Sequence, residues 1–491
     1  MGGILTRITL SHTRSPRYSL HTKIKHALFA LFLFAVSTQC AGASGNPTSL
    51  QPMGGNIGNQ QPVVIPGPVL GPGGDQSQQV QGGSAHAVQT LQGLVTLDQA
   101  LNQTILTGPR AAAARSLLGI AQAGIIQAKI LPNPALEFDQ GYAEGSYRVG
   151  VALPLEPPWK RVLRVAAARA QLDTAAIQLQ QSLWQLRAEI RRAYAELVVS
   201  QESLVMMKQF ATLTQQLADV ATKRNQSGDV PKLDVYKAEL AAAQADIDAG
   251  QADRRVTQAR EQLNIIMGRP EEADLPVPHL APFQLHTEKA NSLLPNLAEE
   301  LPSMSQYIDQ ALKERLEVKL ISAEIIANRA MRKLTVGNIL PNGQISFGWD
   351  LQLPSNYGDS QLNSVYLMGS FPIPICDRQQ GELARIAATG SNLNLEMNSQ
   401  RNIIRGQVAL AYRKVVNARE NMRKYQESVI AQSQKVAELG RLSYQLGQTD
   451  ITAALNAQQA NIQVRNLYLT EVMNYEQAFT DLEQAVGHVL Q

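Results

Sequence analysis

The sequence is poor in cysteine and in aromatic residues, and both shortages restrict what the protein can be. The two cysteines among its 491 residues are Cys40 and Cys376, and Cys40 lies in a segment that we expect to be removed, so no disulfide can form within the mature chain. Aromatic residues make up 5% and charged residues 17% of the sequence, which favours helices packed through small side chains over a large aromatic core. The 44 basic and 41 acidic residues give a net charge of +3, so nucleic acid is not an expected partner.

Long apolar runs are also missing, apart from one near the N-terminus. The ten apolar residues 27–36 follow Lys23 and Lys25 and are too few to cross a bilayer as a helix. Small residues at 41–43 supply a cleavage site, so we predict a signal peptide over residues 1–43 and an exported protein. The alternative is a lipoprotein anchored through Cys40, although a bulky glutamine precedes this cysteine where small residues are usual.

Signatures of catalysis and of metal binding are absent from the sequence as well. His279, His286 and His488 do not have the spacing of metal ligands, and a single cysteine in the mature chain excludes a thiolate cluster. No G-x-S-x-G, phosphate-loop or H-E-x-x-H pattern is present. We therefore expect no enzyme, no cofactor and no metal site.

After residues 44–92, whose Gly, Pro and Gln predict an extended tail or linker, the chain is a tandem repeat. The tetrapeptide "ILPN" occurs at 130–133 and at 339–342, an offset of 209. Other matched pairs keep nearly the same offset. It is 218 for Pro154/Pro372 and Ala193/Ala411, and 219 for Gly228/Gly447 and Gly268/Gly487. Anchors in one order at a nearly constant offset indicate a duplication, with repeat 1 over residues 93–283 and repeat 2 over residues 284–491.

Each repeat is expected to contain the same elements in the same order. A first helix ends at the proline of "ILPN", two strands follow, and a very long helix leads to a glycine turn and a returning helix. The expected first helices are 97–129 and 303–335, the long helices 160–226 and 381–446, and the returning helices end near Gly268 and Gly487. A helix of about 67 residues spans roughly 100 Å, which indicates an extended coiled coil rather than a globular domain.

The strand pairs alternate between apolar and polar residues, which predicts two pairs of membrane-spanning β-strands. The apolar positions on one face are Leu136, Phe138, Tyr142, Tyr147, Val149, Val151 and Leu153 in repeat 1, and Ile345, Phe347, Trp349, Leu351, Leu353, Val365, Leu367, Phe371 and Ile373 in repeat 2. The alternative is a pair of hairpins half-buried against helices. Four strands would leave unsatisfied edges in lipid, so in the membrane interpretation three copies would combine into a twelve-stranded barrel.

With these features the chain resembles the TolC-like outer-membrane efflux channels over residues 97–491. The resemblance rests on the duplicated order of elements, both "LPN" corners, the glycine turns, and the "IMG" and "AVG" ends of the returning helices. In addition, "FPIPICDRQQGELARIAA" at 371–388 is similar to the "FDRNQG" segment of the heavy-metal, CzcC-type branch, with Cys376 in place of the usual Phe and Gln379 in place of Asn.

The resemblance implies an α+β fold in which a trimeric, twelve-stranded transmembrane β-barrel, four strands per chain, continues into a long periplasmic α-helical coiled-coil barrel. It implies a homotrimer in the outer membrane of a Gram-negative-type cell, working with a periplasmic adaptor (membrane fusion) protein and an inner-membrane transporter such as an RND pump or an ABC exporter. The chain would be the passive exit duct of a tripartite efflux or type I secretion system for small molecules or metal ions. The alternative is a periplasmic coiled-coil adaptor or scaffold, which would share the helices but would not need four amphipathic strands.

The resemblance also implies where the periplasmic entrance lies. Family members tie an Asp after the first glycine turn to a Tyr before the second, and these positions are Asp234 and Tyr444 here. The helix-tip turns at Gly228 and Gly447 would contact the adaptor. Alternative interpretations are a helix-start carboxylate for Asp234 and ordinary packing for Tyr444.

Two further family positions at the entrance differ in this sequence. An Arg two residues past the second turn is replaced by Thr449, and the two Asp residues of an acidic ring are replaced by Ala453 and Asn456. Asp450 could supply that ring instead, or it could be a plain helix-start residue. The loss of the paired carboxylates weakens the expectation of strong cation binding at this constriction.

Overall fold

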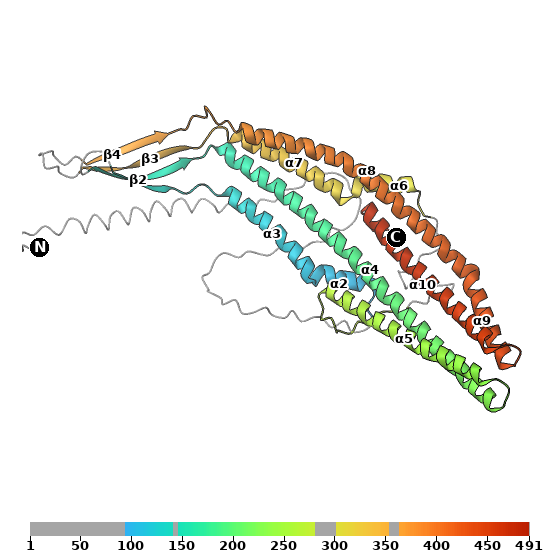
Figure 1. The fold of residues 1–491 in the computed structure, drawn as a ribbon. Coiled ribbons are helices and arrows are strands. Elements are labelled where there is room, and N and C mark those ends of the chain that lie inside the picture. The colour runs from blue at the N-terminus through green and yellow to red at the C-terminus, as the bar shows by residue number, and fades with distance from the viewer. Residues whose placement is uncertain (1–93, 141–145, 280–300, 353–362, 491) are drawn as a thin grey trace, which may run out of the picture. The chain divides into compact units, whose positions relative to one another are not determined.

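The computed structural model describes residues 94–140, 146–279, 301–352 and 363–490 (Figure 1). All of these residues belong to one unit, Ala85–Gln491. The predicted signal peptide at 1–43 and the tail at 44–92 lie outside the described residues, as do Tyr142 and Leu353 of the predicted strands. The predicted boundary between the repeats, at residue 283, also lies outside them and stays a prediction.

The same order of elements occurs twice, so the duplicated sequence folds into two similar halves. Repeat 1 contains α2 (Leu97–Thr107), α3 (Pro109–Lys129), β1 (Ala135–Gln140), β2 (Ser146–Leu155), α4 (Pro158–Gln226) and α5 (Lys232–Met267). Repeat 2 contains α6 (Met304–Glu314), α7 (Leu316–Gly337), β3 (Gly343–Gln352), β4 (Asn363–Ser370), α8 (Gln380–Lys424), the π-helical turn η2 (Tyr425–Val429), α9 (Ile430–Gln445) and α10 (Ile451–Val486). The 69 residues of α4 extend from the end of β2 to the first glycine turn, a distance of roughly 100 Å (Figure 1).

The four strands form one antiparallel sheet in the order β1-β2-β3-β4. The register places Phe138 opposite Val149, Val149 opposite Trp349, and Trp349 opposite Val365. The predicted apolar positions of both repeats therefore share one face of a single sheet, because side chains that are paired across strands point to the same side. This face is uncovered in the single chain, where Phe138 is 73% and Leu367 78% exposed.

The opposite face of the sheet is polar. Arg148 pairs with Asp350 at 3.1 Å across β2 and β3, and the Gln344 amide donates to the Glu137 carboxylate at 2.6 Å. The prediction that the last strand continues to Ile373 is wrong, because β4 ends at Ser370. Pro372 and Pro374 lack the backbone N–H that a strand ladder needs, which explains why the strand stops there.

The prediction of a single first helix in each repeat is also wrong, since both are broken. In repeat 1, Pro109 cannot donate to the helix and forces Gly108 into an extended conformation, so α2 ends and α3 begins there. In repeat 2, Arg315 takes the same extended conformation without a proline and pairs with Glu317 at 2.9 Å. Both breaks pack against the glycine that ends the returning helix: Gly268 has no room for a side chain beside Pro109, and a Cβ at Gly487 would lie 3.0 Å from the Arg315 Cα.

The long helix predicted over residues 381–446 is interrupted by one π-helical turn, Tyr425–Val429. The offset between the repeats changes from 218 at Ala411 to 219 at Gly447, so repeat 2 has one extra residue between these positions. A π-helical turn holds one residue more than an α-helical turn, and this one accommodates the insertion without ending the helix. The Gln426 amide donates to the Tyr468 hydroxyl of α10 at 2.7 Å and ties the turn to its neighbour.

Small side chains pack the helices closely, as the composition predicts. A row of buried alanines at three-, four- and seven-residue spacing lines α5 against α4: Ala238, Ala242, Ala245, Ala249, Ala252 and Ala259. A larger core lies where α4 and α10 of the two repeats meet, around Tyr194, Leu197, Tyr468 and Leu482. Among the described residues, the helices include none with the length and apolar composition needed to traverse a bilayer.

Candidate functional site at the helix tips

The two glycine turns are built alike, although their sequences differ. Gly228 and Gly447 both have left-handed backbone conformations, with φ of 80° and 76°, which a residue with a side chain adopts only at a cost. In the first turn, the Gly228 amide donates to the Asn225 carbonyl at 3.0 Å and the Asp229 amide donates to the Arg224 carbonyl at 2.9 Å. In the second turn, the Gly447 amide donates to the Tyr444 carbonyl at 3.0 Å and the Gln448 amide donates to the Ser443 carbonyl at 2.8 Å. These turns aim two helix pairs, α4/α5 and α9/α10, at the same tip of the unit.

Arg224 at the end of α4 joins the two helix pairs. Its guanidinium donates to the Tyr444 carbonyl at 2.8 Å and lies 5.1 Å from the centroid of the Tyr444 ring. Tyr444 is only 1% exposed and packs in a small apolar cluster with Ala221, Val235 and Ile451. One arginine from repeat 1 therefore holds both the backbone and the ring of the last turn of α9 in repeat 2.

Lys237 makes a second link between the repeats. Its ammonium group lies 3.8 Å from the Asp234 carboxylate one turn earlier on α5 and donates to the Thr452 hydroxyl of α10 at 3.1 Å. Asp234 is buried in the first turn of α5, where a carboxylate is favoured by the helix dipole. The structure thus brings Asp234 close to α10 through a lysine.

The predicted tie between Asp234 and Tyr444 is not formed in this structure and stays a prediction. Both residues lie at the tip, but the Tyr444 hydroxyl has no hydrogen-bond partner in the described part of the chain. Burial raises the pKa of Tyr444 above its usual value. The Arg224 guanidinium lowers this pKa, and the carboxylates of Asp234 and Asp450 raise it. A buried hydroxyl without a partner is costly, so an acceptor brought within hydrogen-bonding distance of it would be stabilising.

Asp450, Ala453 and Asn456 are all exposed and share one face of α10 at intervals of three residues. Asp450 is the N-cap residue of α10, and the Thr452 hydroxyl lowers the pKa of its carboxyl, helped by Lys237. The face that follows is neutral at Ala453 and Asn456. Within the described ranges no group of three His, Cys, Asp or Glu side chains is arranged to hold a metal ion, here or elsewhere.

Arg224 and Lys237 are the tip residues that the sequence analysis missed. Their counterparts at the offset of 219 are Ser443 and Asn456, so both charges occur in one repeat alone. A charged residue that is present in only one half of a duplication is a signal that could have identified them. Both side chains belong to repeat 1 and contact repeat 2. Comparing the two repeat sequences does not reveal these contacts.

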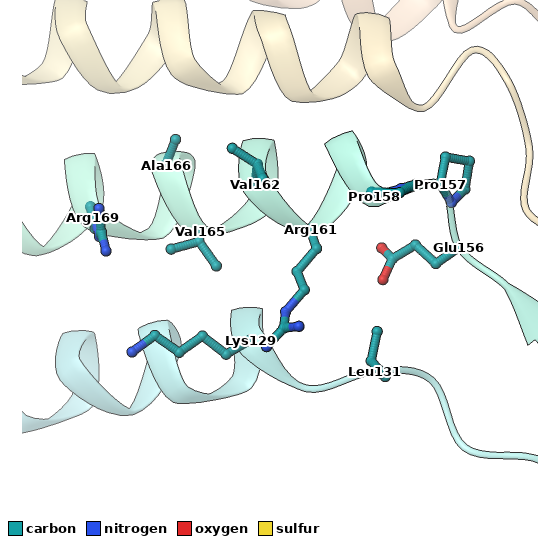
Figure 2. Close-up of a pocket in the computed structure, with 10 residues that line it drawn as sticks. All are labelled: Lys129, Leu131, Glu156, Pro157, Pro158, Arg161, Val162, Val165, Ala166 and Arg169. Carbon is teal, nitrogen blue, oxygen red and sulfur yellow. The ribbon is translucent and has the colours of Figure 1, made fainter. Parts of the chain in front are cut away.

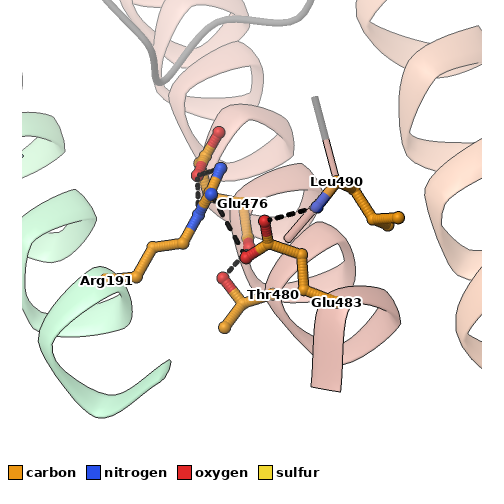
Figure 3. Close-up of polar contacts among 5 residues, drawn as sticks. All are labelled: Arg191, Glu476, Thr480, Glu483 and Leu490. Carbon is orange, nitrogen blue, oxygen red and sulfur yellow. Dashed lines mark hydrogen bonds and ion pairs between the residues drawn. The ribbon is translucent and has the colours of Figure 1, made fainter. Parts of the chain in front are cut away.

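A second polar feature joins the repeats in the core, far along α4 from the tip (Figure 3). Arg191 of α4 reaches Glu476 and Glu483 of α10 at 3.2 and 3.3 Å, and the three side chains are 9%, 2% and 4% exposed. Glu483 also accepts from the Leu490 amide at 3.1 Å, which fastens the residues after α10. Oε1 of Glu476 has no partner among the described residues. Among the described residues, the two buried carboxylates therefore share one arginine that forms ion pairs with them.

The stability of the protein is expected to fall as the pH rises from about 4.5 to about 7. Burial raises the pKa of Glu476 to about 7 despite the nearby Arg191, so the folded state holds a proton that the unfolded chain releases above pH 4.5. The pKa of Glu483 is raised by burial in the same direction. The Glu476→Gln variant should show a smaller loss in urea denaturation across this pH range. An equal pH dependence in both proteins would contradict the assignment.

Comparisons with known proteins connect this architecture to a family. A family profile described as "Outer membrane efflux protein" matches residues 110–269. The cobalt-zinc-cadmium resistance protein CzcC of Cupriavidus metallidurans is 22% identical over 400 residues, covering 80% of this chain and 90% of that protein. The chain is similar to the outer membrane efflux proteins. This similarity supports a channel-type component of the outer membrane rather than the periplasmic adaptor or scaffold.

Solved structures of outer membrane proteins show the same fold. The outer membrane protein VceC of Vibrio cholerae superposes with a TM-score of 0.60 at 14% identity, covering 80% of this chain and 96% of that chain. The open state of the outer membrane channel MtrE of Neisseria gonorrhoeae gives a TM-score of 0.59 at 16% identity, covering 80% and 89%. At such low identity the agreement concerns the fold, which confirms the predicted combination of long helices and a small antiparallel sheet.

Proposed function

We propose that three copies of this chain form a passive exit duct through the outer membrane, as the outer part of a tripartite efflux system. The observation that carries this proposal is the sheet, whose apolar face is exposed along all four strands while β1 and β4 are left as open edges. Three such sheets joined edge to edge make a closed twelve-stranded barrel with an apolar outer face and a polar interior. The interior would carry Arg148, Asp350 and Glu137.

Exposed apolar rows on the helices support the association of copies. On α5, and again on α9, large side chains recur at heptad-related spacing on faces that the chain itself leaves open. On α5 the residues are Leu233, Tyr236, Leu240 and Ile247, which are 54–73% exposed. On α9 they are Val436 and Leu439, followed by Leu446 at its C-cap, and these are 55–71% exposed. Packing α5 of one copy against α9 of the next would cover both rows and close a helical tunnel below the barrel.

The tunnel would receive its cargo from an inner-membrane transporter through a periplasmic adaptor that docks on the tips at Gly228 and Gly447. Divalent metal ions are the first cargo to test, because CzcC is named as a cobalt-zinc-cadmium resistance protein. The neutral face at Ala453 and Asn456 favours a duct that passes ions without holding them. The tip contacts of Arg224 and Lys237 would keep the entrance narrow until the adaptor or the transporter moves the helices.

The proposal predicts that a charge on the apolar face of the sheet blocks assembly, whereas the same charge on the other face does not. Leu367→Arg places a cation on the lipid side, at a cost of about 2–4 kcal/mol per copy near the bilayer midplane. Met368→Arg, the next residue on β4, points to the polar side and is the matched control. Outer-membrane fractionation and gel mobility before and after heating should show a heat-dissociated trimer for the wild type and for Met368→Arg, and much less of it for Leu367→Arg. A soluble wild-type protein would end the proposal.

A further inference from the structure

A hollow of about 690 Å³ lies where the helices of repeat 1 meet the sheet (Figure 2). The last residues of α3 and the first three turns of α4 form its walls. Its lining residues are Lys129, Leu131, Glu156, Pro157, Pro158, Arg161, Val162, Val165, Ala166 and Arg169. Since β2 ends at Leu155, immediately before Glu156, the hollow begins where the apolar strand face stops.

The hollow carries an excess of positive charge. Among the described residues, the side chains of Lys129, Arg161 and Arg169 form no ion pair, and all three are exposed. The one carboxylate in the lining, Glu156, has a side chain that is only 4% exposed and is paired with Arg164, outside the lining. Figure 2 shows Arg161 extending from α4 toward the end of α3, where Lys129 lies. Three free cations around one cavity favour an anionic ligand.

The hollow is also lined by exposed apolar side chains. Leu131 is 57% and Val162 68% exposed, and Val165 and Ala166 continue the same face of α4. Exposed leucine and valine beside free basic groups suit a ligand with a charged head and an apolar chain. The position directly below the lipid-facing strands is where lipid headgroups end.

Repeat 2 shows that the corner does not require these charges. The counterpart of Lys129 at the local offset of 209 is Asn338, and the counterparts of Arg161 and Arg169 at the offset of 218 are Gln379 and Ala387. A helix–strand corner of the same architecture is therefore built with three neutral residues. The basic residues in repeat 1 are explained by neither the turn nor the packing.

We propose that this hollow binds the phosphate headgroup of an anionic phospholipid in the leaflet that surrounds the lower rim of the sheet. Arg161 and Lys129 hold the phosphate, and the acyl chains run past Val162 and Leu131 onto the apolar strand face. Arg169, two turns farther along α4, attracts the headgroup from the side away from the membrane. The site rests on the proposed outer-membrane location and adds a lipid class to it: phosphatidylglycerol or another phospholipid with net negative charge.

The test measures lipid binding to the detergent-solubilised full-length protein by native mass spectrometry. Phosphatidylglycerol should bind more tightly than phosphatidylcholine with the same acyl chains. Exchanging the two phosphate-binding residues for their repeat 2 counterparts, Lys129→Asn with Arg161→Gln, should weaken phosphatidylglycerol binding by about twentyfold or more, because each basic residue near a lipid surface contributes roughly a factor of five. Arg254→Gln with Arg255→Gln removes the same charge from an exposed part of α5 and should leave binding unchanged.

Three results would overturn the lipid site. These are equal affinity for the two lipids, unchanged affinity in the Lys129→Asn/Arg161→Gln variant, and displacement of the lipid by millimolar inorganic phosphate, which would assign the hollow to a free anion. The proposed function is tested separately, by the membrane fraction and gel mobility of the same wild-type protein. A wild-type trimer in the outer membrane without lipid preference would remove the lipid site alone.

Discussion

Replacing Arg191 by methionine is expected to lower the free energy of unfolding by about 3–5 kcal/mol, the largest stability effect of any substitution considered. The variant keeps the volume of the side chain but leaves Glu476 and Glu483 buried without their closest cation. A desolvated carboxylate costs several kcal/mol unless it is paired or protonated. Urea denaturation followed by circular dichroism at 222 nm measures the loss.

Arg192→Met is the matched control for this prediction. Arg192 is the next residue on α4 and also makes an ion pair, with Asp481 at 2.7 Å, but its side chain is 34% exposed and that of Asp481 is 39% exposed. An exposed pair contributes less than about 1 kcal/mol, so the control should stay near wild type. The loss in Arg191→Met should also be smaller at pH 5 than at pH 8, since the carboxylates can then be neutralised by protons. Equal losses in both variants would show that the cluster does not act through burial.

Removing Arg224 and Lys237 together is expected to open the entrance of the duct. The two side chains make the two described polar links from repeat 1 to the tip of repeat 2, to the Tyr444 carbonyl and to the Thr452 hydroxyl. A hydrogen bond from a charged group contributes about 1.5–3 kcal/mol, so Arg224→Ala with Lys237→Ala should raise the population of open channels by about a hundredfold or more. Single-channel recording in planar bilayers would detect the change as higher mean conductance.

Lys232→Ala is a suitable control, because this lysine lies at the same tip but faces Tyr236 on its own helix, 5.4 Å from the ring centroid. The channel conductance of the Lys232→Ala variant should match that of the wild type. Asp234→Ala with Tyr444→Phe tests the tie that the family resemblance implies, and it should raise conductance less, because the Tyr444 ring and carbonyl keep their contacts with Arg224. If the Arg224→Ala/Lys237→Ala variant has the same conductance as the wild type, these links do not control gating.

The sequence was sufficient to predict the parts of the fold that depend on periodicity. Alternating residues from Ile345 onward predicted a strand face that the register confirms, and the offsets of Gly228 and Gly447 predicted two turns that share their hydrogen bonds. The breaks at Gly108 and Arg315 were missed for different reasons. Pro109 lies inside the predicted helix 97–129, where a proline breaks a helix, so this break was visible in the sequence and was overlooked. The break at Arg315 has no proline, and the residue that packs against it, Gly487, is far along the chain.

Most of the candidate site could not be predicted, because its contacts join residues about 220 positions apart. Asp234 and Tyr444 both lie at the tip, but the tie between them stays a prediction, and Arg224 is the residue that contacts Tyr444. Pair spacing within one helix says nothing about which side chain of another helix lies opposite. Comparing the two repeats would have shown that Arg224 and Lys237 lack charged counterparts, but not what they contact.

The π-helical turn at Tyr425–Val429 has a geometric consequence for the second hairpin. An extra residue in a regular α-helix rotates everything after it by about 100° around the helix axis. The wider turn offsets that rotation, and the second turn keeps the hydrogen bonds of the first: the carbonyls of Asn225 and Tyr444 each accept from the amide of the glycine three residues later. The two hairpins have therefore diverged in length without losing their common direction. A duplicated chain can lengthen one of its halves and still present two aligned tips to a shared partner.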